Sequence, residues 1–185
     1  MFDQVEINAD EANGTKEQIL TNARVLFATH GYDGTSIRQL TSSLNITPAA
    51  LYYHFASKND VLEAVTRNLY ERSRDLLERI ENYDKNPEML KEVLSEYYDV
   101  LAKDIDVFVL VYNDAAIQHS SVGKKLRQQA KAFFAYLVGD NPSVEDRMRA
   151  AGSVGIIRLS LQQVGADFAS HRSKIVERAF TVMTD

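Results

Sequence analysis

Signals that start and end short helices follow one another through the first third of the chain, and they limit its possible folds most. Apolar residues recur at helical spacing over residues 15–30. Ser36 and Gln39 have the spacing of a capping box. Thr47 followed by Pro48 is an N-cap followed by a first-turn proline, which is a strong helix start. The pattern predicts three helices before residue 55, with a tight turn between the second and the third.

Two residues fit the breaks between these helices. Gly31 stands where a glycine commonly ends a helix. Asn45 stands in the predicted turn, and asparagine tolerates the left-handed backbone that a tight turn needs. We therefore expect Gly31 to end the first helix and Asn45 to lie in the turn.

The helical pattern continues to the end of the chain. Ser57 and Asp60 form a second capping box before a long helix that runs to about Ile80. The β-branched segment 105–112 could form a strand by propensity alone. A lone strand among helices would have no pairing partner, so we predict a buried helix there. The expected fold is all-α with about nine helices, and a β-sheet would contradict it.

The predicted organisation has three parts. Residues 1–14 are polar and acidic, which predicts a disordered arm rather than a signal or transit peptide. Residues 15–56 contain the three short helices, and residues 57–185 form a longer helical body. The longest apolar run, 107–112, is far shorter than the roughly 20 residues that span a bilayer. We expect a cytoplasmic protein with no membrane contact.

Composition excludes several kinds of site and argues against a strongly basic surface. The chain has no cysteine, which excludes disulfides, thiolate metal sites and a cysteine nucleophile. Its net charge is −5, whereas phosphate contacts require a basic footprint. Four basic and four acidic residues lie between Thr15 and Val65. Any basic patch there must be local.

The three short helices and the long helix after them have helix-turn-helix spacing. The third helix begins at Thr47, where free N–H groups favour an anion. Ala49 and Ala50 would allow close approach to a groove and contact with thymine methyl groups. The sequence therefore predicts that the third helix reads DNA.

Polar side chains around that helix can add further contacts. Tyr52, Tyr53 and His54 can donate hydrogen bonds outward. Arg38 on the second helix and Lys58 at the start of the fourth are expected near phosphate. The simpler alternative is that the aromatic residues are core and the two cations merely solvated.

Two stretches together resemble the signature of TetR-type (TetR/AcrR family) regulators. They are Thr35-Ser36-Ile37-Arg38-Gln39-Leu40 and Ile46-Thr47-Pro48-Ala49-Ala50-Leu51-Tyr52-Tyr53-His54-Phe55-Ala56-Ser57-Lys58. The resemblance covers about residues 15–65, and it implies a DNA-binding domain over 15–56 and an effector-binding and dimerisation domain over 57–185. The residues expected at or near DNA are Thr35, Ser36, Arg38, Thr47, Pro48, Ala49, Ala50, Tyr52, Tyr53, His54 and Lys58.

The same resemblance implies core positions and shows two departures. Leu51 and Phe55 are expected in the core. Asn45 stands where the family often has glycine, and Ala49 and Ala50 stand where glycine or a hydroxyl residue is common. Base reading at the alanines would therefore depend more on apolar contact.

An effector pocket between the fourth and seventh helices is a further implication of the resemblance. Aromatic residues of the body could line it, although core packing is the simpler interpretation for each. Gln118 and His119 could add polar specificity. The candidate residues are Tyr97, Tyr98, Phe108, Tyr112, Gln118, His119, Phe133 and Phe134, with Tyr136 nearby in the sequence.

No residue pattern indicates catalysis, a metal or a cofactor. Asp104 and Asp106 have the spacing of a metal-binding pair but fit the acidic first turn of a helix. The four histidines are scattered, which argues against zinc. The segment 122–124 lacks a phosphate-binding loop, and Ser120 and Ser121 lack a nucleophile motif. We predict a protein that is not an enzyme and has no cofactor.

The last two helices are the expected homodimer interface, because their small residues would let a partner helix approach closely. The small residues are Ala150, Ala151, Gly152, Ser153 and Gly155, and the apolar ones are Ile156, Leu159, Ile175, Val176, Ala179, Phe180 and Met183. Packing within one chain is the alternative use for any of them. By resemblance, the two helices form a four-helix bundle with their copies. A nearly neutral head would also need two DNA half-sites.

Three hypotheses for function follow. The first is a homodimeric repressor that a small apolar or amphipathic effector releases from a double-stranded DNA operator. The second is a DNA-binding architectural or cell-division protein on the same scaffold, without a ligand. The third is a helical enzyme or adaptor that has lost DNA binding. A cavity in the body would favour the first hypothesis over the second.

Overall fold

The computed structural model describes residues 9–83 and 86–185, and every element among them is helical. A 3₁₀ segment joins the last two α-helices. The described elements are α1 (Ala9–His30), α2 (Ile37–Ser42), α3 (Pro48–His54), α4 (Lys58–Ile80), α5 (Pro87–Lys103), α6 (Ile105–Asn113), α7 (Ala115–His119), α8 (Ser121–Val138), α9 (Val144–Val164), η1 (Gly165–His171) and α10 (Arg172–Thr184). The predicted all-α fold is confirmed.

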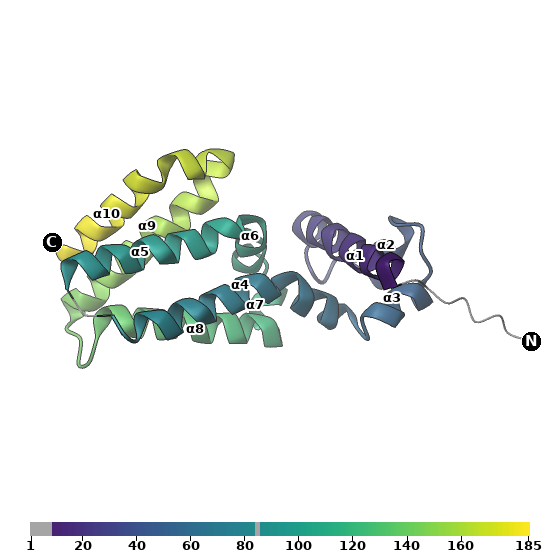
Figure 1. The fold of residues 1–185 in the computed structure, drawn as a ribbon, viewed down its shortest axis with the longest axis horizontal. Helices are drawn as coiled ribbons and strands as arrows, with labels where there is room; N and C mark the ends of the chain where they lie inside the picture. The colour runs from purple at the N-terminus through teal and green to yellow at the C-terminus, as the bar shows by residue number, and fades with distance from the viewer. Residues whose placement is uncertain (1–8, 84–85) are drawn as a thin grey trace, which may run out of the picture.

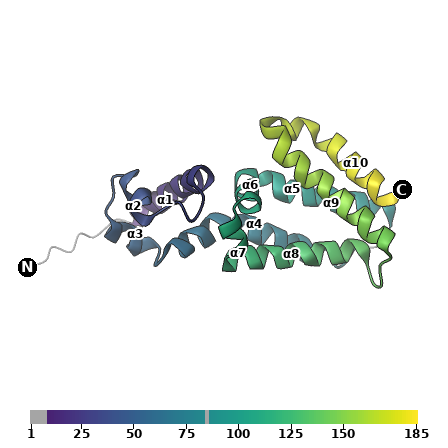
Figure 2. The same ribbon diagram turned by 180° about the vertical axis from the view of Figure 1, so that it is seen from behind.

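The molecule is elongated, with a small head at one end and a larger body behind it (Figure 1). Helices α1, α2 and α3 form the head, and α4 runs from the head into the body. The chain ends at the far end of the body from the head, beside α9 and α10. Viewed from behind, α9 and α10 lie together over α5 (Figure 2).

The start and stop signals act as expected. Gly31 (φ 75°) and Asn45 (φ 55°) both have left-handed backbone. The Ser36 hydroxyl accepts a hydrogen bond from the backbone N–H of Gln39, and the Gln39 side chain caps the backbone of Ser36 in return. These caps satisfy backbone donors that a helix end leaves free. They fix where α2 begins and where the turn before α3 bends.

Two expectations differ from the structure, and a third agrees with it. Helix α1 begins at Ala9, so residues 9–14 of the predicted disordered arm are helical, while residues 1–8 lie outside the described residues. The short helix α7 was missed, because five residues between two capping residues carry no usable periodicity. Segment 105–112 is helical, as predicted, despite its strand-like composition.

Long-range polar contacts hold the body helices in place. Arg72 of α4 pairs with Asp104, which precedes α6 and is almost fully buried. The Tyr98 hydroxyl donates to the backbone carbonyl of Phe168 (2.6 Å), which fixes α5 against the 3₁₀ segment. Arg172 and Asp99 form a two-pronged pair (2.6 and 2.7 Å) between α10 and α5. Such charge-assisted fork geometry fixes orientation as well as distance.

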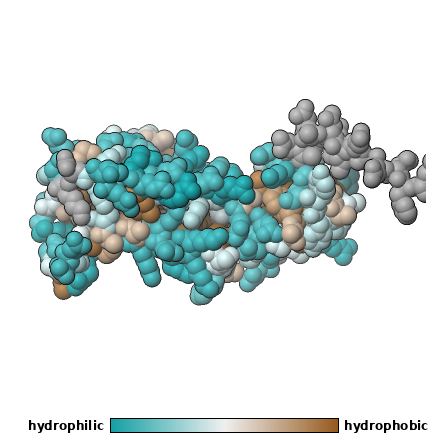
Figure 3. All heavy atoms as spheres, turned by 60° about the horizontal axis from the view of Figure 1, so that its bottom comes forward, coloured by the Kyte–Doolittle hydropathy of each residue, from teal (hydrophilic) through white to brown (hydrophobic). Residues whose placement is uncertain are grey.

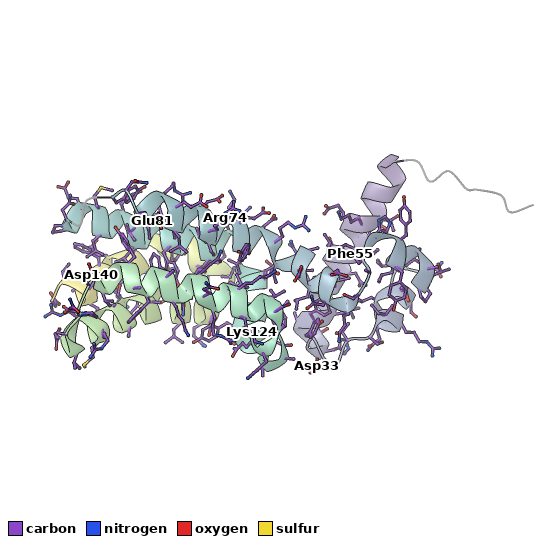
Figure 4. All side chains as sticks on the ribbon, turned by 90° about the horizontal axis from the view of Figure 1, so that it is seen from below. Asp33, Phe55, Arg74, Glu81, Lys124 and Asp140 are labelled. Carbon is purple, nitrogen blue, oxygen red and sulfur yellow. The ribbon has the colours of Figure 1, made fainter. Side chains whose placement is uncertain are left out.

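The length of α4 sets the distance between the two ends of the molecule. Arg74 and Glu81 lie successively further from the head along this helix, and Asp140 marks the far end of the body (Figure 4). Phe55 lies in the head, just before α4 begins. Anything bound in the body must therefore act on the head through α4 or through the elements beside it.

Candidate DNA-reading surface and effector cavity

Helix α3 presents its exposed side to solvent from a firmly capped start. The Thr47 hydroxyl accepts a hydrogen bond from the Ala50 N–H (3.1 Å), as an N-cap does. Leu51 is fully buried and Phe55 is almost so, which confirms both as core residues. The helix is therefore anchored on one side and free on the other.

The free side carries two large aromatic side chains. Tyr52 is 51% exposed and Tyr53 is 68% exposed, which is unusual for residues of this size. The small residues Pro48 and Ala49, one turn earlier, are also exposed. His54 is partly buried, and its ring lies edge-on to that of Tyr53 at 5.0 Å. The exposed side of α3 thus carries small side chains at its start and two tyrosine hydroxyl groups one turn later.

Helix α2 contributes one exposed cation to the head, Arg38. Arg38 is exposed, and the neighbouring Ser36 is exposed but already bonded to Gln39. Hydrophobic residues gather on the head in Figure 3, whereas the body surface seen there is mostly hydrophilic. The head surface is thus poor in charge, as its composition predicted.

Thr35 does not fit the role expected from the sequence. It is 1% exposed, and its hydroxyl donates to the backbone carbonyls of Leu26 and Gly31. Its side chain cannot reach a phosphate without leaving the core. Thr35 therefore shapes the loop between α1 and α2, and its expected place at or near DNA would rest on this loop rather than on its buried side chain.

Lys58 also points inward. Its ammonium group donates to the carbonyls of Tyr32 (2.7 Å) and Thr35 (2.9 Å) and lies 4.2 Å from the centre of the Tyr32 ring. These bonds fasten the first turn of α4 to the loop after α1. The ammonium group of Lys58 is thus held by this loop in the structure, and its phosphate contact stays a prediction.

A cavity of about 390 Å³ lies in the body, between α4, α5, α6, α8 and α9. Its size is in the range of small-molecule sites. Of the predicted pocket residues, the structure places on its wall Tyr97, Phe108, Tyr112, Gln118 and Phe133.

Three predicted pocket residues do not line this cavity. Tyr98 is 1% exposed and bonds to Phe168 on the other side of α5. His119 is exposed on α7, where its Nδ1 lies 2.7 Å from the carbonyl of Ala115. Phe134 is partly buried next to Phe133 but outside the lining. Neighbouring residues on a helix point in different directions, so sequence proximity to a lining residue was a poor guide.

Sequence reasoning missed most of the polar lining. Ser73 on α4, Arg127 and Gln129 on α8 and Arg158 on α9 all border the cavity. Ser73, Arg127 and Gln129 resemble the other polar residues of their helices, and Arg158 is a single cation within a mostly apolar segment. Only the packing of α9 against α5 and α8 brings Arg158 to the cavity.

Tyr97 and Arg158 form the polar centre of the wall. The Arg158 Nε–H donates to the Tyr97 hydroxyl (2.5 Å), and the Tyr97 ring stacks on Phe133 with 4.2 Å between ring centres. Burial raises the pKa of Tyr97, and the nearby Arg158 opposes this shift. Tyr97 is therefore a neutral, fixed hydroxyl at physiological pH.

A second set of contacts joins the head to the body. The Asp114 side chain, between α6 and α7, accepts from the Tyr32 N–H (2.6 Å) and from the Ile117 N–H (2.9 Å). Arg24 of α1 lies 3.7 Å from Asp106 of α6. A cleft of about 550 Å³ borders these residues between α1, α6 and α9. One carboxylate thus caps α7 and holds the loop after α1.

Two structural observations concern other kinds of site. In residues 9–83 and 86–185, no three or more histidine, cysteine or acidic side chains are arranged to hold a metal ion. Asp104 and Asp106 instead pair with Arg72 and Arg24. Among the described helices, none has the length and apolarity that a membrane crossing requires.

The head has the geometry of a helix-turn-helix DNA-binding domain. The molecule is therefore a helix-turn-helix protein with a separate helical body. A family model described as "Bacterial regulatory proteins, tetR family" matches residues 19–65, which is the head and the start of α4. The head is therefore similar to the DNA-binding part of TetR-family regulators, which are DNA-binding proteins rather than enzymes.

Curated relatives match mainly the first part of the chain. The biofilm operon icaADBC negative transcriptional regulator IcaR of Staphylococcus epidermidis is 30% identical over 116 residues, which cover 61% of this chain and 62% of IcaR. IcaR of Staphylococcus aureus strain Newman is 31% identical over 100 residues, or 53% and 54% of the two chains. The matches thus span between half and two thirds of these relatives.

Solved structures share the fold over nearly the whole chain. A transcriptional regulator of Aquifex aeolicus VF5 has a TM-score of 0.66 at 24% identity and covers 91% of this chain and 99% of its own. A TetR-family regulator of Bordetella parapertussis 12822 has a TM-score of 0.69 at 17% identity, with 92% and 94% covered. FadR of Bacillus subtilis, solved with stearoyl-CoA, has a TM-score of 0.57 at 16% identity, with 90% and 98% covered. At these identities the likeness shows the fold alone.

Proposed function

We propose that this protein is a homodimeric transcriptional repressor that binds double-stranded operator DNA and is released by a small effector. The exposure of Tyr52 and Tyr53 on a helix whose other side is buried carries the DNA-binding part of the proposal. Two large aromatic side chains that are exposed side by side form a surface patch of the kind that marks an interaction site. Repression is supported by IcaR, which is named as a negative regulator. Its place of action would be the cytoplasm, where operator DNA is accessible.

The reading contacts follow from the geometry of the head. We assign base reading to Ala49, Ala50, Tyr52 and Tyr53, with the thymine methyl groups as apolar partners of the alanines. Thr47, Pro48 and the backbone N–H of Ala49 would face phosphate. Arg38 supplies a cation, and Ser36 and His54 lie at the edge of this surface. Because one head offers few positive charges, two heads are needed for a stable complex.

A stripe of apolar and small residues along α9 is the proposed dimer surface. Val144, Met148, Ala151 and Leu159 are exposed at helical spacing, and Gly155 lies among them. A side chain added at Gly155 would meet no atom within 4 Å, so the chain itself leaves this position open. A second copy of the chain would bury this stripe and leave the reading heads at the ends of the dimer.

Part of the interface expected from the sequence is used within one chain instead. The inner residues of the last two helices are buried within the protomer, because α9 and α10 pack closely against each other. Gly152 lies against Val182, where an added side chain would come within 2.9 Å of it. The residues buried in this way are Ala150, Ser153, Ile175, Val176 and Ala179. We therefore narrow the proposed surface to the outer stripe of α9, with Ile156, Phe180 and Met183 at its margin.

Effector release would act through the elements between the cavity and the head. Phe108 and Tyr112 of α6 and Gln118 of α7 line the cavity, and Asp114 lies between these two helices. A ligand that displaces this part of the wall would move Asp114 and, with it, the backbone of Tyr32. Lys58 links the same loop to α4, so the angle of the head could change.

DNA binding can be tested with the DNA upstream of the gene in a gel shift. Tyr52→Ala should weaken binding about five-fold or more, because a base contact is worth roughly 1–3 kcal/mol. Val25→Ala, an exposed apolar residue on α1, is the control and should bind as the wild type does. Arg38→Ala should lower the slope of log affinity against log salt by about one. Unchanged binding in both test variants would exclude this surface.

Assembly can be tested by light scattering. Gly155→Glu places a charge in the centre of the α9 stripe and should give monomers with reduced operator affinity, while helix content is unchanged. Gln128→Glu on α8, exposed and matched in charge change, should remain dimeric. A monomeric wild type at micromolar concentration would contradict the proposed assembly. A dimer that no small molecule releases would favour the ligand-independent DNA-binding protein.

A further inference from the structure

The cavity wall has a charge opposite to that of the protein. The chain carries a net charge of −5, yet the residues that line the cavity include two arginines, Arg127 and Arg158, and no aspartate or glutamate. Most of the remaining wall is leucine, valine and aromatic side chains. The cavity thus combines an apolar interior with positive charge that its wall does not neutralise.

Arg158 is the cation best placed to act on a ligand. It is partly buried, whereas Arg127 is exposed. Other partly buried arginines have acidic partners, as Arg72 does with Asp104. Within the described residues, the guanidinium group of Arg158 forms a single hydrogen bond, from Nε to the Tyr97 hydroxyl, and no ion pair. An arginine that is partly withdrawn from water and has no acidic partner favours an anion at this point.

Tyr97 offers a second donor at the same place. Its hydroxyl oxygen accepts the bond from Arg158, so its own O–H proton remains available. Stacking on Phe133 fixes the direction in which the hydroxyl points. Two donors from α5 and α9 can therefore meet the oxygens of one anionic group, which is the geometry that charge-assisted bonds favour.

We propose that the cavity binds a small amphipathic carboxylate, with its carboxylate on Arg158 and Tyr97 and its apolar part among the side chains of α4, α6 and α8. This inference rests on the proposed effector role of the cavity and specifies the chemical class of the effector. The apolar part would lie against Leu76, Phe108 and Leu126, where burial of carbon surface adds affinity.

The position of Arg158 also gives the ligand a route to the dimer surface. Arg158 directly precedes Leu159 and lies one turn after Val154, on the same helix as the exposed stripe. Neutralising its charge would change the forces on α9, which carries the proposed interface. One ligand would thus contact α6, on the side of the head, and α9, on the side of the partner.

The test uses two pairs of probes that share a carbon skeleton and end in either an ionised carboxylate or a neutral hydroxyl group. The pairs are 4-phenylbutyrate with 4-phenyl-1-butanol, and decanoate with 1-decanol. Titration calorimetry on the full chain should show that each carboxylate binds at least about ten-fold more tightly than its alcohol, because bonds to charged groups exceed neutral ones.

Variants of the cavity wall then show which residue causes the preference for a carboxylate over an alcohol. Arg158→Gln should weaken carboxylate binding about ten-fold or more and leave alcohol binding within about two-fold, which also shows that the cavity is intact. Arg158→Lys should keep most of the preference, and Tyr97→Phe should lose a few-fold of it. Arg127→Gln is the matched control and should change carboxylate binding less than about three-fold.

The outcomes separate this inference from the effector role itself. Alcohols that bind as tightly as carboxylates would overturn the carboxylate assignment but leave an effector cavity. An equal loss in Arg127→Gln and Arg158→Gln would overturn the assignment to Arg158. If none of the four probes bound up to its solubility limit, the carboxylate assignment would be overturned, and release of operator DNA by other small molecules would then test the effector role separately.

Discussion

The core of the head and the core of the body use similar residues but pack them differently. In the head, Leu40 and Leu51 are fully buried within the hydrophobic core. In the body, Tyr97, Leu126 and Phe133 border a cavity of about 390 Å³. A closely packed head holds the reading helix in one position, whereas an open body can admit a ligand. The body therefore has weaker packing at the cavity, which is where the proposed effector would bind.

The largest expected contrast comes from the same truncation in each region. Leu51→Ala should cost about 3–5 kcal/mol of unfolding free energy, because it opens a hole in a closed core. Leu126→Ala should cost about 1–2 kcal/mol, since this side chain is partly exposed and already borders empty space. Urea unfolding followed by circular dichroism measures both. Equal losses would mean that the two cores are packed alike.

Replacing alanine with leucine should lower the free energy of unfolding in the head but not in the body. Ala23→Leu adds volume to a fully buried position of α1 and should destabilise by about 1–3 kcal/mol. Ala130→Leu fills part of the cavity from α8 and should be neutral or stabilise by about 0.5–2 kcal/mol. The second variant should also lose the binding of 4-phenylbutyrate. A destabilised Ala130→Leu that still binds the probe would show that the cavity lies elsewhere.

The smallest expected effect is on pH dependence. Burial raises the pKa of Tyr97 above the value of about 10 that an unfolded tyrosine has. Between these two pKa values the folded protein keeps the Tyr97 proton and the unfolded chain releases it. The free energy of unfolding is therefore unaffected by Tyr97 below about pH 10 and declines as pH rises through the folded pKa. The slope cannot exceed about 1.4 kcal/mol per pH unit for one group.

Thermal or urea unfolding between pH 9 and pH 11 would detect it as a slope. Tyr97→Phe should make the alkaline loss of stability less steep than in the wild type. Tyr53→Phe, an exposed tyrosine of the head, is the matched control and should leave the slope unchanged. An identical slope in Tyr97→Phe would mean that this hydroxyl is not desolvated in the folded body.

Local chemistry made most of the head predictable. Caps and turns depend on residues that are within a few positions of one another, such as Ser36 with Gln39 and Thr47 with Ala50. Asn45 and Gly31 could be assigned because few residues tolerate a left-handed backbone. The burial of Leu51 beside the exposure of Tyr52 follows from helical periodicity once one side of α3 is anchored.

Tertiary structure decided which residues take part in sites. Lys58 was expected at phosphate from its place in the motif, yet the carbonyls of Tyr32 and Thr35 turn its ammonium group inward. Arg158 could not be found from the sequence, because its neighbour Tyr97 is distant in the chain and meets it only when α9 packs on α5. The sequence alone determined where the capped helices α2, α3 and α4 begin and which chain segment resembles a DNA-reading head. The cavity and its charge arise from helix packing, since side-chain direction across helices depends on contacts that no short segment contains.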